Sequence, residues 1–443
     1  MNQSNPNPFP LNATLIENLI KENNLNLCSI SIRELNRLVD KLSEKCSVEF
    51  LRFEFGIPGL IANRMGPEEE IRILKENPSL PSTYPPFDGV PRLKKATALF
   101  CKKFMNIDVQ PENCLPTVGA MHGCFISQAI SARRGENANT ILFLDPGFPV
   151  NKLQAKFLGL NVKSVDLYNY RGEKLIDKLE KLFSTGTIGG VIWSSPNNPS
   201  WICLKGKELK GIGELLTKYD VIGIEDIAYF GMDFRYDYSV PGSPPYQPTV
   251  ATYTDNYFII ISSSKIFSYA GQRVAVTIIS PELMNKKYSY LKTYFNTDKV
   301  GNAFIHGGLY TTTAGVAQTP QIALASYFEA ASNGQYDFLS ELKIYAERAK
   351  KAKKIFLKYG FNLAYSKDME EQISDGFYFT IKREGFNSDT LLYHMLRFGL
   401  AGIPLNTTGS TIEGVRICVS LIRSDQFEEL EFRVRELNSF LIN

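Results

Sequence analysis

Two polar stretches that follow apolar runs in the middle of the chain contain side chains able to do chemistry. The run VIGIED ends in Asp226, with Tyr229 three residues further on, and FIIISS precedes Lys265 and then Arg273. A lysine that leaves an apolar strand can have its ammonium form destabilised, which suits it to Schiff-base formation. Each of these residues alone is an ordinary loop or helix-cap residue, so the interpretation depends on the set.

Other residues supply partners for a phosphorylated ligand. The stretch CLPTVGAMHGCF predicts a Gly-Ala turn that opens a helix, and free backbone N–H groups near Ala120 can hold a phosphate there. Ser262 and Arg273 can add a hydroxyl and a forked guanidinium contact. Asn198, in SPNNPSW, and Tyr229 can donate hydrogen bonds to a ring oxygen. A ligand with an aldehyde, a ring nitrogen, a ring oxygen and a phosphate needs these partners, which describes pyridoxal 5′-phosphate.

The elements that must position these residues are short apolar runs alternating with helical patterns. The runs predict buried strands at 140–145, 162–167, 191–195, 221–226, 258–263 and 274–279, and helices at 173–183 and 207–219. Continuous apolar strands that alternate with helices indicate an α/β fold with a mostly parallel sheet sandwiched by helices. In such sheets ligands bind beyond the carboxyl ends of the strands, where these polar residues are expected.

The chain is expected to form a large and a small domain. The large cofactor-binding domain is predicted over 79–325 and a smaller α+β domain over 326–443, with a helix at 338–360 bridging them. In the small domain, GFYFTIKRE, a helix at 388–398 and VRICVSL are its expected elements. The first 78 residues are mostly helical in pattern and are predicted to pack with the small domain.

Composition excludes several classes of protein. The 443 residues have a formal net charge of +3, which gives no reason to expect nucleic acid or an acidic membrane as a partner. The polar start MNQSNPNPFPLN has no signal-peptide pattern, and no segment has the length of a membrane span. Seven scattered cysteines and three isolated histidines predict reduced thiols, no metal site and a cytoplasmic location.

The motifs, in this order along the chain, resemble those of the class I/II aminotransferases, the aspartate aminotransferase-like branch of fold-type I pyridoxal-phosphate enzymes. The likeness runs from about Tyr84 to Val419, and its motifs are YPPFDGVPRLKKA, TVGAM, DPGFP, SPNNPS, EDIAY, SSSKIFSYAGQRVA and GVRICVS. The chain departs from the family pattern at Ser195, at Ser200-Trp201 and at Ala275. These departures affect the expected substrate rather than the cofactor contacts.

The resemblance implies a role for each matching residue. Lys265 would hold the cofactor as an internal aldimine and shuttle the substrate's α-proton, and Asp226 would keep the ring nitrogen protonated. Arg416, with Asn198, would bind the substrate α-carboxylate, and Tyr84 would reach the phosphate of the neighbouring subunit in a homodimer. The other cofactor contacts are expected from Tyr229 and Asn198 on the ring oxygen, Phe148 on the ring face, and Ala120, Met121, Ser262 and Arg273 on the phosphate. His122, beside the phosphate turn, is assigned a structural role.

The resemblance thus predicts a ping-pong aminotransferase that moves the amino group of an α-amino acid to a 2-oxo acid. A second interpretation is a lyase or cyclase acting on a modified amino acid, because fold alone cannot separate these reactions and the Trp201 loop is unusual. A third is a non-catalytic regulatory protein that binds the cofactor. Only about 80 residues precede Tyr84, and they show no basic DNA-binding segment.

Overall fold

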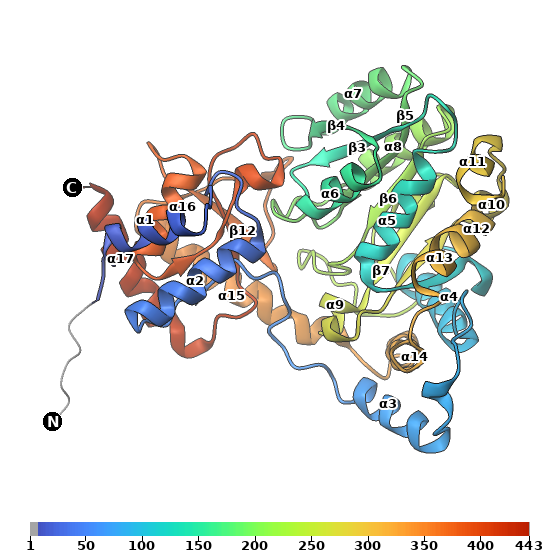
Figure 1. Cartoon of the computed structure of the whole chain (residues 1–443), viewed down its shortest axis with the longest axis horizontal. Coiled ribbons are helices and arrows are strands. Elements are labelled where there is room, and N and C mark those ends of the chain that lie inside the picture. The colour runs from blue at the N-terminus through green and yellow to red at the C-terminus, as the bar shows by residue number, and fades with distance from the viewer. Residues whose placement is uncertain (1–7, 443) are drawn as a thin grey trace. The chain divides into compact units, whose positions relative to one another are not determined.

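The computed structural model describes residues 8–442, and the chain divides into two compact units (Figure 1). The large unit comprises Leu60–Asn197 and Ile202–Leu342, and the small unit comprises Met1–Gly59, Asn198–Trp201 and Lys343–Asn443. The limits predicted at 78 and 325 both fall inside the large unit. Residues 60–78 belong there because α3 (Met65–Glu76) packs against α14 (Gln318–Ser332). Residues 1–7 and 443 of the predicted domains lie outside the described residues.

The large unit is built on a seven-stranded sheet in the order β2-β8-β7-β6-β5-β3-β4. Every pair is parallel except those of β8, which runs antiparallel to both β2 and β7. The mostly parallel sheet and its six predicted strands are therefore confirmed. The strands are β2 (Cys114–Thr117), β3 (Thr140–Asp145), β4 (Asn161–Asp166), β5 (Ile188–Ser194), β6 (Ile222–Asp226), β7 (Tyr257–Ser262) and β8 (Ala275–Ile279).

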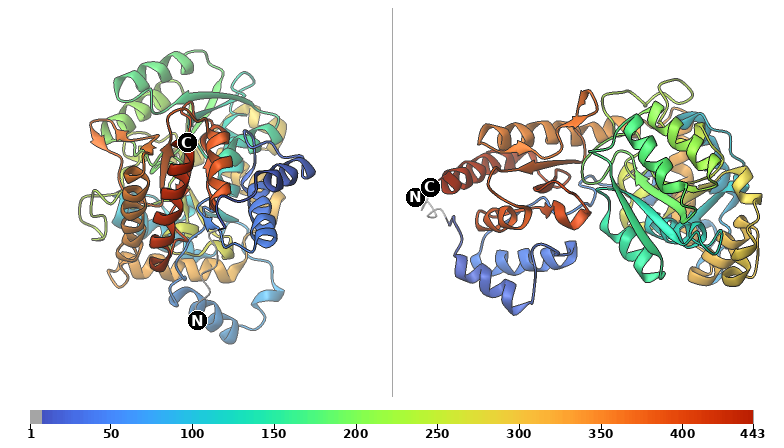
Figure 2. Two further views of the ribbon diagram at one scale, coloured as in Figure 1. Left: turned by 90° about the vertical axis from the view of Figure 1, so that its left-hand side faces the viewer. Right: turned by 90° about the horizontal axis from the view of Figure 1, so that it is seen from above.

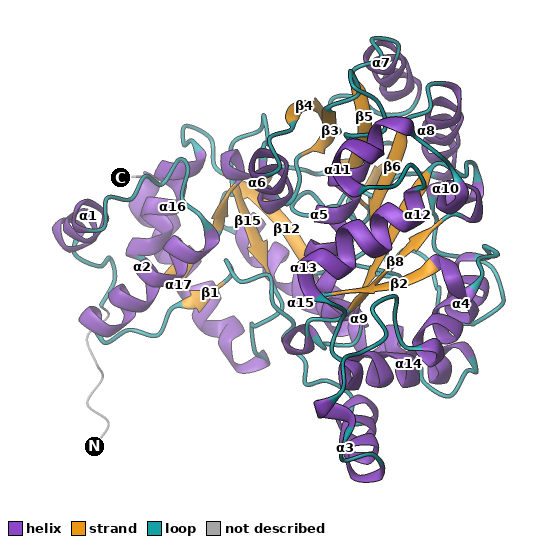
Figure 3. Ribbon diagram, turned by 45° about the vertical axis from the view of Figure 1, so that its right-hand side comes forward, coloured by secondary structure: helices purple, strands orange, loops and turns teal. Residues whose placement is uncertain are grey.

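Helices cover both faces of this sheet, so its inner strands are buried almost throughout and are mostly apolar (Figure 3). Helix α5 runs across β6 and β7, and its Ile126 and Ile130 belong to the same buried apolar cluster as Ile224 and Ile260 of these strands. The helices of the unit are α3, α4 (Pro91–Met105), α5 (Gly119–Ser131), α6 (Pro149–Phe157), α7 (Glu173–Phe183), α8 (Gly206–Lys218), α9 (Ser263–Ile266), α10 (Pro281–Asn285), α11 (Lys292–Phe295), α12 (Val300–Asn302), a π-helical turn (Ala303–Tyr310), α13 (Thr311–Thr313) and α14.

The small unit packs helices on a four-stranded antiparallel sheet in the order β14-β15-β12-β9. Helix α15 (Phe338–Lys358) begins in the large unit and continues here, and α17 lies beside it, with Lys358 Nζ 2.6 Å from Glu431 Oε1 (Figure 2). The strands are β1 (Leu51–Arg52), β9 (Asn362–Leu363), β10 (Lys367–Asp368), β11 (Glu371–Gln372), β12 (Tyr378–Lys382), β13 (Leu400–Ala401), β14 (Ile403–Pro404) and β15 (Val415–Cys418), and the other helices are α1 (Ala13–Glu22), α2 (Ile32–Cys46), α16 (Ser388–Arg397) and α17 (Phe427–Ile442).

The N-terminal helices belong to the core of the small unit. Ile16 of α1 and Leu35 of α2 are completely buried among apolar residues of α16 and α17. A reciprocal capping box between Ser31 and Glu34 starts α2, so its first backbone N–H groups are satisfied.

Three further observations concern membrane-spanning helices, cysteine residues and metal ligands. Within residues 8–442 no helix has an apolar stretch long enough to cross a bilayer. The seven cysteines are free thiols, five of them buried. In the same part of the chain no three His, Cys, Asp or Glu side chains gather as metal ligands would.

Candidate active site

Asp226 ends β6, one of the inner strands of the sheet. The backbone N–H of Ala228 donates to its carboxyl group, whereas Oδ1 is shielded from solvent and accepts no hydrogen bond from any described residue. Because burial disfavours the charged form, the pKa of Asp226 is raised to about 7. A cationic donor against Oδ1 would satisfy this oxygen and favour the carboxylate.

Lys265 lies in α9, the short helix that follows β7 directly. Strands β6 and β7 are parallel, with Asp226 opposite Ile260, so both leave the sheet at the same edge. The Oγ of Ser262 caps α9 by accepting from the N–H of Ser264 at 3.2 Å. The buried hydroxyl of Ser263 donates to the carbonyl of Val274 at 2.6 Å, which ties α9 to the start of β8. The strand and these two serines fix the partly buried Lys265 at the edge that Asp226 occupies.

Arg273 lies against the first turn of α5. Thr117 of β2 pairs with Ala275 of β8, which brings the two segments together. Gly119 has φ +70°, and a Cβ on it would overlap Nη2 of Arg273, so the guanidinium rests on the backbone of this turn. Nη1 of Arg273 donates to the carbonyl of Ala270 at 2.8 Å. Backbone N–H groups of α5 and a guanidinium thus lie side by side, a combination that binds anions.

The loop after β5 is held by its own polar residues. Ser195 Oγ accepts from the N–H of Leu204 at 3.1 Å, and Nδ2 of Asn197 donates to the carbonyl of Pro146 at 2.9 Å. Ser195, which departs from the family asparagine, therefore has a structural contact in this chain. Phe148 follows β3 as the N-cap residue of α6 and is partly exposed. Tyr229, three residues beyond Asp226, is buried.

Asn198 and Arg416 meet within the small unit. Arg416 on β15 is 2% exposed, and its Nη1 donates to Asn198 Oδ1 at 3.1 Å. Its Nη2 donates to the carbonyl of Glu54 at 2.7 Å, and its guanidinium carbon lies 4.4 Å from the ring centroid of Tyr378. The two predicted substrate-binding residues are therefore neighbours.

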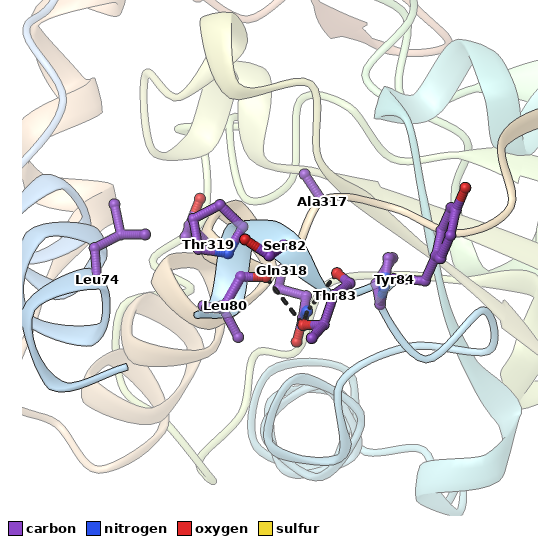
Figure 4. Close-up of a pocket in the computed structure, with 10 residues that line it drawn as sticks. Leu74, Leu80, Ser82, Thr83, Tyr84, Ala317, Gln318 and Thr319 are labelled. Carbon is purple, nitrogen blue, oxygen red and sulfur yellow. Dashed lines mark hydrogen bonds between the residues drawn. The ribbon is translucent and has the colours of Figure 1, made fainter. Parts of the chain in front are cut away.

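Tyr84 lines a cavity on the surface of the large unit. Its side chain is 88% exposed and lines a surface cavity of about 630 Å³ (Figure 4). Gln318 also lines this cavity and contacts the residue before Tyr84. Its Nε2 lies 3.4 Å from both the carbonyl oxygen and Oγ1 of Thr83. None of the other predicted site residues lines this cavity.

Two polar residues of the large unit were not assigned a chemical role from the sequence. Glu225 lies completely buried beside Asp226, and burial raises its pKa to about 7 although Trp193, Thr249 and Val250 donate to it. The two adjacent acidic residues at the end of the apolar run VIGIED were the sequence feature that could have indicated a buried carboxyl group at Glu225. His122 keeps its Nδ1 as an acceptor for the N–H of Val118, and burial lowers its pKa to about 4.

Two residues of the small unit that contact Arg416 were likewise not predicted from the sequence as part of the site. Glu54 places its carbonyl oxygen on Arg416, and Tyr378 places its ring there. Both contacts join segments that are separate in the sequence, and no local motif predicts them.

The donors and acceptors at the sheet edge fit the group that the sequence predicts. The oxygen of Asp226 that lacks a donor matches a protonated ring nitrogen, and the turn at Gly119 with Arg273 matches a phosphate. Lys265 supplies an amine at the same edge. These features lie within one unit.

Solved structures share this fold. An aspartate aminotransferase from Thermus thermophilus (a double mutant) superposes with a TM-score of 0.74 at 16% identity, covering 92% of this chain and 96% of that one. An aspartate aminotransferase from Thermotoga maritima gives 0.73 at 18% identity, covering 96% and 99%. The predicted fold class, that of the fold-type I pyridoxal-phosphate enzymes, is confirmed.

The chain belongs to the family described as aminotransferase class I and II, whose model matches residues 68–319. It is 24% identical over 268 residues to an aspartate aminotransferase from Pyrococcus horikoshii, covering 59% of this chain and 62% of that protein. It is 26% identical over 203 residues to a probable aspartate aminotransferase from Methanocaldococcus jannaschii, covering 45% and 50%. The alignments thus span about half to three fifths of these relatives. Members of the family are pyridoxal-phosphate-dependent.

Proposed function

We propose that this chain is a pyridoxal-phosphate-dependent aminotransferase that passes the amino group of an α-amino acid to a 2-oxo acid in two half-reactions. The observation that carries the proposal is the shielded Asp226 Oδ1, which accepts no hydrogen bond from a described residue, at the sheet edge that presents Lys265. Family membership supports the same assignment. When bound, pyridoxal phosphate supplies an aldehyde that condenses with amines and a ring that accepts electrons from the α-carbon.

Residues around the sheet edge would hold this group. Asp226 Oδ1 would accept the ring N–H, and its negative charge would keep the proton on that nitrogen. Arg273 and the hydroxyl of Ser262 would bind the phosphate, together with the backbone N–H groups of Ala120 and Met121. The ring itself would be flanked by Phe148 on its face and by hydrogen bonds from Tyr229 and Asn198 to its oxygen.

Lys265 would do the proton transfer. Its Nζ would hold the cofactor through the aldehyde carbon and, once released as a neutral amine, would take the proton from the substrate Cα. The same amine would deliver that proton to the former aldehyde carbon rather than back to Cα, and on the same face, so the transfer would be positioned rather than diffusive. Arg416 would bind the substrate α-carboxylate with the N–H groups that its protein contacts leave over, as a forked ion pair.

Replacement of Lys265 tests the assignment. In Lys265→Ala we expect the folded protein to lose the visible absorbance of a lysine-bound cofactor, and borohydride treatment should no longer attach cofactor mass to the peptide around position 265. Lys102→Ala is the matched control, since Lys102 is an exposed α4 lysine paired with Asp108. Cofactor mass on residue 265's peptide in wild type and Lys102→Ala, and its loss in Lys265→Ala, would support the proposal. Unchanged absorbance in Lys265→Ala would contradict it.

The reaction type is tested with single amino acids and no acceptor. An aminotransferase consumes the visible band once and releases one 2-oxo acid per site. Continuous release of ammonia or a thiol with the band retained would instead identify a lyase.

We further propose a homodimer in which Tyr84 reaches the cofactor phosphate of the other subunit. The support is the highly exposed phenol of Tyr84 at the rim of the cavity in Figure 4 and the family resemblance of its segment. The cytoplasmic location stays a prediction from the sequence.

A further inference from the structure

Arg416 is held on three sides within the small unit. Nη2 donates to the carbonyl of Glu54, Nη1 donates to Asn198, and the guanidinium lies over the ring of Tyr378. Its Nε is shielded from solvent and donates to no residue in 8–442. Two of the five N–H groups of the guanidinium are thus used by these contacts, which leaves three for a ligand.

The ring of Tyr378 has a backing of its own. Tyr378 pairs with Cys418 and Thr380 pairs with Arg416 across β12 and β15, so Tyr378 and Arg416 are diagonal neighbours on one face of the sheet. Trp201 meets Tyr378 edge to face, with ring centroids 5.9 Å apart and an interplanar angle of 73°. Trp201, Tyr378 and Arg416 therefore form one continuous stack, here called the arginine stack.

The backbone at Trp201 is strained, and glycines leave space around the rings. Trp201 is completely buried and has φ +63°, a left-handed conformation that is an outlier for a bulky side chain. Two glycines clear space for the stack: a Cβ on Gly376 would overlap the indole of Trp201, and one on Gly56 would press on the hydroxyl of Tyr378. An indole kept in a strained conformation against Gly376 indicates a specific requirement for that ring.

Trp201 also anchors the segment that carries Asn198. Residues 198–201 belong to the small unit although they interrupt the sequence of the large one. Burial of the indole therefore holds two of the contacts of Arg416, the ring of Tyr378 and the Oδ1 of Asn198.

We propose that Trp201 is a positioning residue for the substrate carboxylate, acting through Tyr378 and Asn198 to fix the plane of the Arg416 guanidinium. This inference rests on the carboxylate-binding role of Arg416 proposed above. A guanidinium fixed before the substrate arrives loses less freedom on binding a carboxylate, so affinity rises. The proton transfer at Lys265 does not depend on the stack, so the effect falls on KM rather than on kcat.

The experiment uses the full-length, cofactor-loaded protein and the amino donor that the single-amino-acid assay identifies. In Trp201→Phe and Tyr378→Leu we expect KM for the donor to rise about tenfold while kcat stays within about threefold. Calorimetry with the donor's analogue that has hydrogen in place of the amino group should show the same rise in Kd. Tyr378→Phe keeps the ring face and should raise KM less than Tyr378→Leu.

Phe356→Leu is the matched control, because it removes a buried ring from the core of the same unit without touching the stack. Its KM should equal that of the wild type. If Trp201→Phe fails to fold, Trp201→Gly, which tolerates the positive φ, takes its place beside Tyr378→Leu.

Arg416→Ala separates the two levels of the proposal. An unchanged KM in Arg416→Ala would overturn the carboxylate role and this inference with it. A raised KM in Arg416→Ala, combined with a Trp201→Phe that matches Phe356→Leu, would overturn the inference alone. A drop in kcat with unchanged KM in Trp201→Phe would also overturn it.

Discussion

At the scale of single residues, Asp226 and Glu225 show how two adjacent acids acquire different chemistry. Successive side chains of a strand point to opposite faces, so the two carboxyl groups enter different surroundings. Glu225 receives three hydrogen bonds, whereas Oδ1 of Asp226 receives none from the described residues. Both pKa values are raised to about 7 by burial, but only Asp226 keeps an oxygen for a ligand.

The raised pKa of Asp226 makes the stability of the cofactor-free protein depend on pH. The unfolded carboxyl loses its proton near its ordinary pKa of 3.8, while the folded one keeps it to about pH 7. The folded state therefore binds one more proton in this window. Its contribution to stability is complete below pH 3.8 and is lost as pH rises through 7, with a slope of at most about 1.4 kcal/mol per pH unit.

We expect Asp226→Asn to flatten that slope by up to this amount in urea denaturation of cofactor-free protein between pH 4.5 and 7. Glu225→Gln should flatten it as well, by the same reasoning. Saturating pyridoxal phosphate should flatten it in Glu225→Gln but not in Asp226→Asn. Parallel curves for the wild type and Asp226→Asn would show that Asp226 is ordinary in the folded chain.

At the scale of elements, the start of α5 depends on a glycine for two separate reasons. The left-handed conformation of Gly119 is costly for other residues, and the guanidinium of Arg273 occupies the place of a side chain. Gly159, after α6, has nearly the same φ of +68°, but no atom lies within 4 Å of the position that a Cβ would take there. A comparison of substitutions at these two glycines therefore separates the cost of backbone strain from the loss of the Arg273 contact at the α5 turn.

Gly119→Ala and Gly159→Ala should both lower the free energy of unfolding by about 1–2 kcal/mol in urea titrations. Only Gly119→Ala should weaken the affinity for pyridoxal phosphate, by about tenfold or more, because it displaces Arg273. Absorbance titration of cofactor-free protein measures this affinity. Equal affinities in the two variants would remove Arg273 and the α5 turn from the phosphate site.

At the scale of the whole molecule, the proposed homodimer with shared active sites would let two defective chains complement each other. Tyr84→Ala and Lys265→Ala should each be severely impaired alone. After unfolding and refolding together, half of randomly paired dimers are mixed and each mixed dimer has one complete site, so roughly a quarter of wild-type activity should return. A mixture that stays at the average of its two components would place Tyr84 and Lys265 in the same subunit or exclude the dimer.

Local sequence signals were enough to predict several elements of the fold. Apolar runs of strand length indicated β3 to β8 because a strand covered on both faces must be apolar throughout. Placing Asp226 and Lys265 at one edge followed from the parallel βα pattern, since such strands end together. The short β2, with Pro116 among its four residues, was too brief to be predicted as a strand.

Contacts between distant segments could not be predicted from local patterns. The folded chain runs β8 antiparallel to its neighbours, places residues 60–78 with the large unit through α14, and sets Trp201 beside Gly376 and Tyr378, whose ring lies against Arg416. Periodicity reports which side of an element is buried but not what buries it. Contacts between segments hundreds of residues apart depend on the shapes that those buried sides present to each other, and these exist only once the chain has folded.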